Sequence, residues 1–287
     1  MGIRTDLTLE AAQQLTKTTP LEGITKNEYQ KANLNITEIT VETDQAAQKL
    51  GKPKGKYITI HSELPLENYP DNFNERVDIL SIEINKLCKD KSNILVVGLG
   101  NKSITPDSLG PDVADQTFAT RHIKQLAADV DTSDLSTVSV IKTGVLGDTG
   151  IESSETVRAV CEKLKPSVVI VIDALACSEI SNLGRTIQLC DTGISPGSGV
   201  ENARKELSAQ TLGTQVIAIG VPTVVDMQTI SEYVFDTPAP NKEMNNMMVT
   251  PRSIDKLIMR VSRLIAMGIN RAFQPNLTIE DITSLVE

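Results

Sequence analysis

The chain has 287 residues, of which 40% are hydrophobic and 23% charged, and its formal net charge is −9. That length is enough for one large or two small domains, and an acidic balance without a basic stripe argues against nucleic-acid or anionic-membrane binding. With no signal-peptide centre, no apolar run of about 18 residues and no C-x-x-C pair among four cysteines, the sequence predicts a cytosolic protein with free thiols.

The first third of the chain predicts a helix, two strands and a second helix. A short polar helix is expected around Thr8–Leu15. Apolar and polar residues then alternate over Leu34–Thr43 and Lys56–Ser62, which predicts an antiparallel hairpin joined through the basic linker "LGKPKGK". Over Asn74–Asp90 the apolar residues recur at helical spacing, which predicts an amphipathic helix.

The middle of the chain alternates between apolar runs and helical stretches. The runs are Ile94–Val97, Val138–Ile141, Val168–Ile172, Ile187–Leu189 and Val216–Ile219. Several are β-branched, as strands buried on both faces are. Helical stretches near Val113–Leu126, Ser153–Leu164 and Ala203–Leu207 separate them. The pattern predicts an α/β fold, a three-layer domain with a mainly parallel central sheet.

Two helices are expected at the C-terminus. The longer one begins at "TPRSID", with Thr250 as its N-cap and Pro251 in its first turn, and the shorter spans Leu277–Glu287. No segment is rich enough in Gly, Pro or Ser to divide the chain, so one domain is predicted.

The glycine-containing stretch "NILVVGLGNKSITPDSLGP", residues 93–111, does not match a nucleotide-binding loop. In a dinucleotide fingerprint Gly98 and Gly100 would fit, but the third glycine position holds Ser103. A P-loop would end in Gly-Lys-Ser/Thr, and Lys102 has no glycine before it. We therefore interpret the loop as a holder for the acid that it contains, Asp107.

Three other catalytic patterns are weak. "GISPG" at Gly193–Gly197 matches a nucleophile elbow, but Pro196 has no N–H for an oxyanion and both histidines precede Ser195. Two distant histidines cannot build a His-rich zinc site. A Cys177 nucleophile would need a histidine partner brought to it by folding alone.

Two acids follow predicted strands. Asp173 comes directly after five β-branched residues, and Asp107 follows the run that ends at Val97; Asp226, after the last run, is a third candidate. Such an acid can simply cap the next helix. Two acids at neighbouring strand ends can instead share one proton, so that one activates water and the other polarises a carbonyl, or they can hold a hard divalent cation.

The motifs "VVGLGN", "TPDSLGP", "IDALA", "VIAIGVPTVVD" and "MVTP" resemble those of the germination protease of spore-forming bacteria, and the likeness runs through nearly the whole chain. This resemblance implies a fold like that of hydrogenase maturation endopeptidases and an atypical aspartic endopeptidase that degrades small acid-soluble spore proteins in the spore core. It implies that Asp107 and Asp173 are the two essential aspartates. No cofactor is expected, and a metal-free mechanism is favoured because nothing here obviously supplies the histidine with which related hydrogenase-processing enzymes bind metal. A metal-assisted peptidase using the same acids and a non-catalytic α/β binding module are the alternatives.

The resemblance also gives a meaning to the N-terminus. Family members are zymogens that remove a short leader, and "IRTDLTLEA" matches their cleavage sequence. The implied cut lies between Asp6 and Leu7, with residues 1–6 as propeptide and 7–287 as the peptidase domain. Without the resemblance, Thr5 or Thr8 would be an ordinary helix N-cap. The family also implies a homo-oligomer such as a tetramer, although the segment that residues 227–248 form here is shorter than in better-known members. No direct nucleic-acid or membrane partner is implied.

Overall fold

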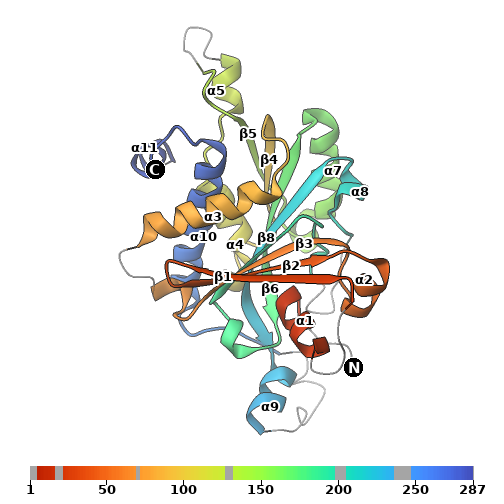
Figure 1. The fold of residues 1–287 in the computed structure, drawn as a ribbon. Coiled ribbons are helices and arrows are strands. Elements are labelled where there is room, and N and C mark those ends of the chain that lie inside the picture. Colours follow the sequence, from red (N-terminus) through yellow and green to blue (C-terminus); the bar gives the residue numbers. More distant parts are fainter. Residues whose placement is uncertain are drawn as a thin grey trace.

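The computed structural model describes residues 5–16, 22–68, 72–126, 132–197, 205–235 and 247–286. Within these ranges, nine strands form one sheet in the order β1-β2-β3-β7-β8-β6-β4-β5, with β9 paired to β8 (Figure 1). The strands are β1 (Ile24–Lys31), β2 (Leu34–Val41), β3 (Gly55–Ser62), β4 (Asn93–Gly98), β5 (Thr137–Lys142), β6 (Val168–Cys177), β7 (Thr186–Cys190), β8 (Gln215–Asp226) and β9 (Met248–Val249).

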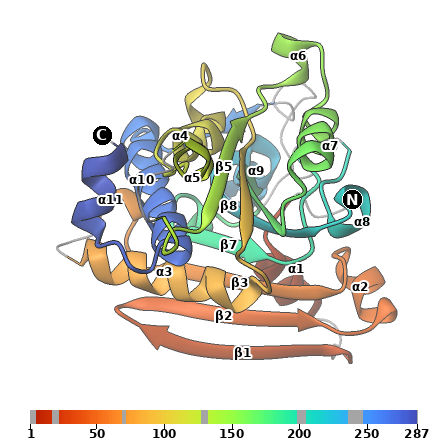
Figure 2. The same ribbon diagram turned by 90° about the horizontal axis from the view of Figure 1, so that it is seen from above.

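The sheet has a parallel part and an antiparallel part. Strands β5, β4, β6 and β8 are mutually parallel neighbours. Strand β7 joins β8 antiparallel, and β3, β2 and β1 continue the sheet antiparallel to an outer edge (Figure 2). The predicted hairpin is therefore present as β2 and β3, but its linker contains a helix, α2 (Asp44–Leu50). Strand β1 was not predicted, because its side chains are mostly exposed and lack alternation.

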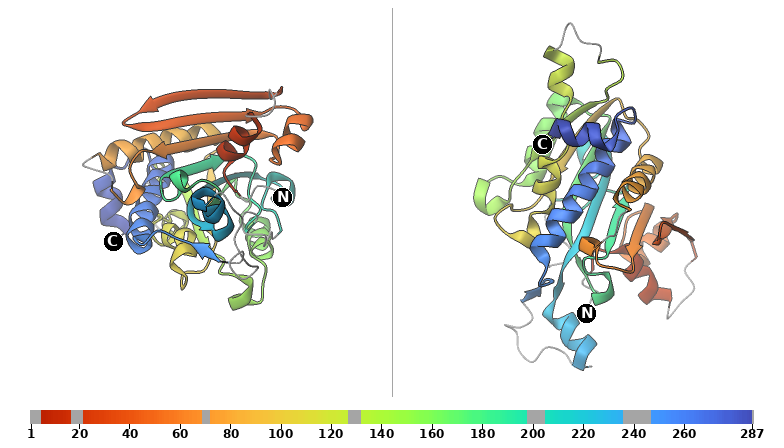
Figure 3. Two further views of the ribbon diagram at one scale, coloured as in Figure 1. Left: turned by 90° about the horizontal axis from the view of Figure 1, so that it is seen from below. Right: turned by 90° about the vertical axis from the view of Figure 1, so that its left-hand side faces the viewer.

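Helices cover both faces of the sheet and complete the predicted three-layer α/β fold (Figures 1 and 3). Helices α3 (Phe73–Leu87), α4 (Leu109–Asp115) and α10 (Ile254–Phe273) pack on one face, and α7 (Ser153–Leu164) with α8 (Ala209–Leu212) packs on the other. The remaining helices are α1 (Thr8–Thr16), α2, α5 (Arg121–Leu126), α6 (Leu146–Thr149), α9 (Met227–Phe235) and α11 (Ile279–Val286). Of the helices in the described ranges, none has the length and apolar character that crossing a bilayer requires.

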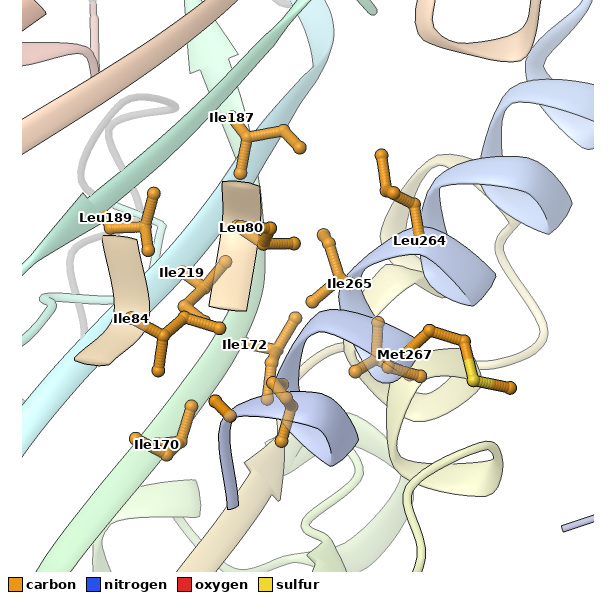
Figure 4. Packing of buried hydrophobic residues seen from close by; sticks show 14 of the residues in the cluster. Leu80, Ile84, Ile170, Ile172, Ile187, Leu189, Ile219, Leu264, Ile265 and Met267 are labelled. Carbon is orange, nitrogen blue, oxygen red and sulfur yellow. The ribbon is translucent and has the colours of Figure 1, made fainter. Parts of the chain in front are cut away.

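The main core lies between the sheet and the α3/α10 layer (Figure 4). Leu80 and Ile84 of α3 meet Ile172 of β6 and Ile219 of β8, and Ile265 of α10 closes the cluster. All of these side chains are buried and aliphatic. The strands that carry the candidate acids are thus fixed by packing on a rigid layer.

Long-range contacts account for three local differences from the predicted helices. The helix expected over Val113–Leu126 divides into α4 and α5, because the buried Thr120 hydroxyl bonds to β5 and its flank. In the stretch Ala203–Leu207, residues 203–204 lie outside the described ranges, and Leu207 exchanges two backbone hydrogen bonds with Ile194 instead of forming a helix. Helix α10 begins at Ile254 rather than beside Thr250, whose hydroxyl donates to the Thr223 carbonyl at 2.8 Å.

Candidate active site

The loop after β4 folds back around Asp107. Asp107 ends a short 3-10 turn, η2 (Thr105–Asp107), and its Oδ2 accepts a hydrogen bond of 2.8 Å from the Asn101 N–H. From β8, the buried Thr223 hydroxyl donates to the Pro106 carbonyl at 2.8 Å. The acid is therefore held both by its own loop and by a neighbouring strand.

Gly100 allows this loop to close on the acid. Its φ is +107°, and a Cβ there would lie 2.1 Å from the Asp107 carbonyl oxygen. Only a glycine combines that backbone conformation with so close an approach. The geometry supports the interpretation of the loop as a holder for the acid.

Asp173 lies where β6 runs past the end of β4. The last β4 residue, Gly98, pairs with Ile172, and the next N–H, that of Leu99, donates to the Ile172 carbonyl at 2.9 Å. Asp173 is only 6% exposed, and its Oδ1 accepts from the Ala174 N–H at 3.0 Å.

Asp107 and Asp173 line the same cavity, which has a volume of about 370 Å³. Its walls are otherwise largely apolar and come from the β4 and β6 ends, from η2 and β8, and from Pro196 and Gly197. The structure thus brings together the two acids that the strand-end argument selected. Gly193, the first residue of the "GISPG" stretch, lines a neighbouring cavity.

Asp6 enters the cavity of the two acids. Its N–H donates to the Ala176 carbonyl at 3.0 Å, and its carboxylate accepts from the Ala176 N–H at 2.9 Å. Asp6 therefore lines the same cavity as Asp107 and Asp173. The following residue, Leu7, is fully buried in an apolar cluster with Leu175, Cys177 and Val225.

The carbonyl oxygen of Asp6 is held by two side chains from other parts of the chain. Lys52 Nζ donates to it at 2.9 Å and Gln188 Nε2 at 3.1 Å. Gln188 Oε1 accepts from the Thr8 N–H at 2.6 Å. The sequence analysis placed Lys52 in a linker and Gln188 inside an apolar run, and it assigned neither a function. The one sequence feature that could have singled out Gln188 is an amide side chain within an otherwise apolar, buried strand.

A helix anchor fixes the segment that follows. Glu10 of α1 is fully buried, and its two carboxylate oxygens accept hydrogen bonds from the Ser178 N–H and hydroxyl (both 2.7 Å), the Glu179 N–H (3.1 Å) and Asn182 Nδ2 (2.7 Å). The Thr5 hydroxyl also donates to it. Helix α1 is thereby tied to the loop after β6, so the Asp6–Leu7 bond is held from both sides.

The third acid candidate and the two histidines lie elsewhere. Asp226 is buried, and its Oδ1 accepts from the Thr229 N–H at 2.5 Å, which makes it a cap of α9 rather than a wall of the acid cavity. His122 is exposed on α5. His61 is half-buried on β3, 3.1 Å from the Thr186 hydroxyl.

The thiols do not offer a nucleophile at this site. All four cysteines are buried and free. Burial raises the pKa of the Cys177 thiol far above its ordinary value, so the reactive thiolate is disfavoured. Within the part of the chain that the structure describes, no three His, Cys, Asp or Glu side chains group closely enough to hold a metal ion.

An α/β sheet with two acids facing one cavity beyond its parallel strands has the arrangement of an enzyme whose chemistry takes place at that edge. The sequence model of the family described as germination protease matches residues 4–237. A germination protease of Clostridium tetani is 38% identical over 322 aligned residues, covering 99% of both chains, and one of Caldanaerobacter subterraneus is 38% identical over 320, covering 100% of this chain and 98% of the relative.

A third relative, the germination protease of a Geobacillus species, is 40% identical over 249 residues, covering 82% of this chain and 67% of its own. Among solved structures, the NiFe hydrogenase maturation protease HycI from Thermococcus kodakarensis matches with a TM-score of 0.37 and 18% identity, over 65% of this chain and 98% of its own. The chain belongs to the germination protease family. It is a protease, and its role is in spore germination.

Proposed function

We propose that this chain is a self-processing endopeptidase in which Asp107 and Asp173 activate water for peptide-bond hydrolysis. The observation that carries the proposal is the shared cavity: the two acids and Asp6 line one space, although they come from three distant segments. Asp6, the residue before the bond that the N-terminal resemblance implies as the processing site, therefore lines the same cavity as the two acids.

In the proposed reaction, one carboxylate of the pair takes a proton from water as the water oxygen attacks the carbonyl carbon. The other carboxyl group carries a proton and donates a hydrogen bond to the substrate. When the tetrahedral intermediate collapses, the C–N bond breaks and the leaving nitrogen takes a proton from the pair. The products are a new carboxylate on Asp6 and a new amine on Leu7, with no covalent enzyme intermediate.

The unprocessed chain is a zymogen in this proposal. Asp6 occupies the wall of the acid cavity through its two hydrogen bonds to Ala176, and a substrate strand could not use that same edge of β6 while Asp6 is bound there. After removal of residues 1–6, the cavity would accept small acid-soluble spore proteins in the spore core. The processed enzyme would act as a homo-oligomer.

The test is incubation of the full chain with a small acid-soluble spore protein, followed by intact-mass measurement of both. We expect the wild type to lose residues 1–6 and to cut the substrate at defined bonds. Asp107→Asn and Asp173→Asn should do neither, because an amide cannot take a proton from water. Removal of divalent ions with a chelator, run in parallel, distinguishes the metal-assisted alternative, which requires that activity be lost and then restored by one ion.

Asp226→Asn is the matched control. It changes a buried acid at the end of a strand in the same way, and asparagine can still cap α9. It should retain both self-processing and substrate cleavage. Full activity in Asp107→Asn or Asp173→Asn would refute the proposed pair, and no activity in any folded form would favour a binding module.

A further inference from the structure

We infer that Lys52 and Gln188 form the carbonyl-binding site of the peptidase, holding the oxygen of the peptide bond that is cut. The inference rests on the proposed function, since it takes Asp6–Leu7 as a bond that the enzyme hydrolyses. It adds two residues with defined roles: donors that stabilise the oxyanion formed when water attacks.

The two donors converge on one oxygen. Lys52 Nζ lies 2.9 Å and Gln188 Nε2 3.1 Å from the Asp6 carbonyl oxygen, distances normal for hydrogen bonds. Lys52 also reaches the Thr5 carbonyl, but more weakly, at 3.5 Å. Two donors on the carbonyl oxygen of the cleaved bond are the arrangement that stabilises tetrahedral intermediates of acyl transfer.

Gln188 is held so that its amide points the correct way. Its Oε1 accepts from the Thr8 N–H at 2.6 Å, which leaves Nε2 as the atom facing Asp6. The same side chain therefore binds the chain on both sides of Leu7, through the Asp6 carbonyl and the Thr8 N–H. This contact fixes the Asp6–Leu7 bond in place as well as polarising it.

One donor, Gln188, and one acid, Asp173, lie on the same face of the sheet. Gln188 of β7 pairs with Gly220 of β8, and Gly220 pairs with Asp173 of β6. Residues paired across strands project to the same face, and two strand spacings separate their backbones by about 10 Å. Gly220 has no side chain, and the side chain of Leu175 fills the space above it, 2.5 Å from where a Gly220 Cβ would lie.

Asp6 lies at the boundary between two cavities. The cavity of about 370 Å³ contains Asp107 and Asp173, and one of about 540 Å³ is lined by Lys52 and Gln188; Asp6 and Leu175 line both. The acids thus line the cavity on one side of Asp6, and the carbonyl donors line the cavity on the other side. Water attack from the first would drive charge onto an oxygen already bound in the second.

The Lys52 ammonium is suited to a developing negative charge. Burial lowers its pKa below the ordinary 10.5, and the Asp6 carboxylate opposes this change. A cation with few water contacts interacts more strongly with a nearby oxyanion than a solvated one does. Lys52 should therefore stabilise the charged tetrahedral intermediate more than it stabilises the neutral carbonyl.

The experiment measures removal of residues 1–6 from the full chain by intact mass over time. Lys52→Met should slow it by about 100-fold or more, the size of effect found when one oxyanion donor is removed. Gln188→Glu keeps an oxygen for the Thr8 N–H but removes the donor to Asp6, and should slow cleavage by at least about 10-fold. Lys52→Arg, which keeps a charged donor, should restore part of the rate. Lys49→Met changes an exposed lysine on the wall of the same cavity and should cleave like wild type.

A second measurement separates a chemical role from simple docking. Hydrogen exchange of the Asp6 and Ala176 amides is followed in the Asp173→Asn background, which keeps the leader attached, with and without Lys52→Met. Unchanged protection together with lost cleavage supports the inference. Equal loss of protection and cleavage overturns it, as does wild-type cleavage by Lys52→Met or Gln188→Glu. If the wild type itself never cleaves, or Asp107→Asn and Asp173→Asn still do, the proposed function fails instead.

Discussion

Replacement of Gly100 by alanine tests whether the glycine loop exists to position Asp107. The added Cβ would sit 2.1 Å from the Asp107 carbonyl oxygen, whereas real Cβ atoms essentially never approach within 3.0 Å. The backbone that carries Asp107 must therefore move by about 1 Å, and a displacement of about 1 Å in a catalytic group can cost about 100-fold in rate. Since the obstructing atom belongs to the backbone, no side-chain rotation relieves the contact.

The stability cost of this change has two parts. Alanine at φ +107° carries strain of about 1–3 kcal/mol, and the contact adds to it. We expect Gly100→Ala to lower the free energy of unfolding, measured by urea titration, by about 2–4 kcal/mol. Cleavage by the folded fraction, followed by mass, should fall by about 100-fold or more.

Gly213→Ala is the matched control. Gly213 has a φ of +70° and no atom within 4 Å of the position its Cβ would take, so only the backbone strain remains. It should cost about 1–2 kcal/mol and leave the cleavage rate of folded protein unchanged. A Gly100→Ala variant that cleaves at the wild-type rate would show that Asp107 need not be held as the structure has it, and the reasoning would be wrong.

Three further changes test the N-terminal anchor and the half-buried His61. Glu10→Ala should lower the free energy of unfolding by about 3 kcal/mol in urea titrations, because several buried donors lose a charged acceptor; a loss below about 1 kcal/mol would mean that the anchor contributes little. Leu7→Ala should cost about 2–5 kcal/mol in the same assay, since Leu7 is fully buried, and a near-neutral effect would contradict its packing. Burial, together with the Arg185 cation, lowers the pKa of His61 below 6.5, so the unfolded chain binds this proton more readily and stability should rise with pH up to about 6.5. His61→Gln should flatten that rise in urea titrations across pH 5–7, and an unchanged slope would assign it to other groups.

The sequence was enough to predict that Asp107 and Asp173 lie close together, because a single rule about parallel sheets leads to it. Parallel strands present their carboxyl ends at a single edge, so acids that follow two neighbouring parallel strands meet there. Buried β-branched runs identified β4 and β6 as such strands, and they are direct neighbours. Placing Asp107 and Asp173 in one cavity required no knowledge of long-range side-chain contacts.

The Asp6 contacts could not be predicted in that way. Lys52 and Gln188 lie 136 residues apart, and they meet Asp6 only because α1 packs with α2 against β2, β3 and β7 of the sheet. Nothing in the local pattern of "LGKPKGK" distinguishes Lys52 from a solvated lysine. The position of Thr250 could not be predicted locally either. Thr250 fits the pattern of a helix N-cap, yet its hydroxyl donates a hydrogen bond to the Thr223 carbonyl of β8.

Cleavage at the proposed site would release very little of the N-terminal structure. Leu7 is buried in an apolar cluster, and Glu10 accepts hydrogen bonds from the loop after β6. Both contacts should keep α1 in place after residues 1–6 are removed. Cleavage removes Asp6, whose carboxylate accepts a hydrogen bond from the Ala176 N–H. The Asp6 carbonyl, which accepts hydrogen bonds from Lys52 and Gln188, leaves with it. The same three residues would then be available to an incoming chain. On this argument, the leader blocks the enzyme by binding as a substrate does, and a free peptide with an acid in the position of Asp6 should compete for the vacated site.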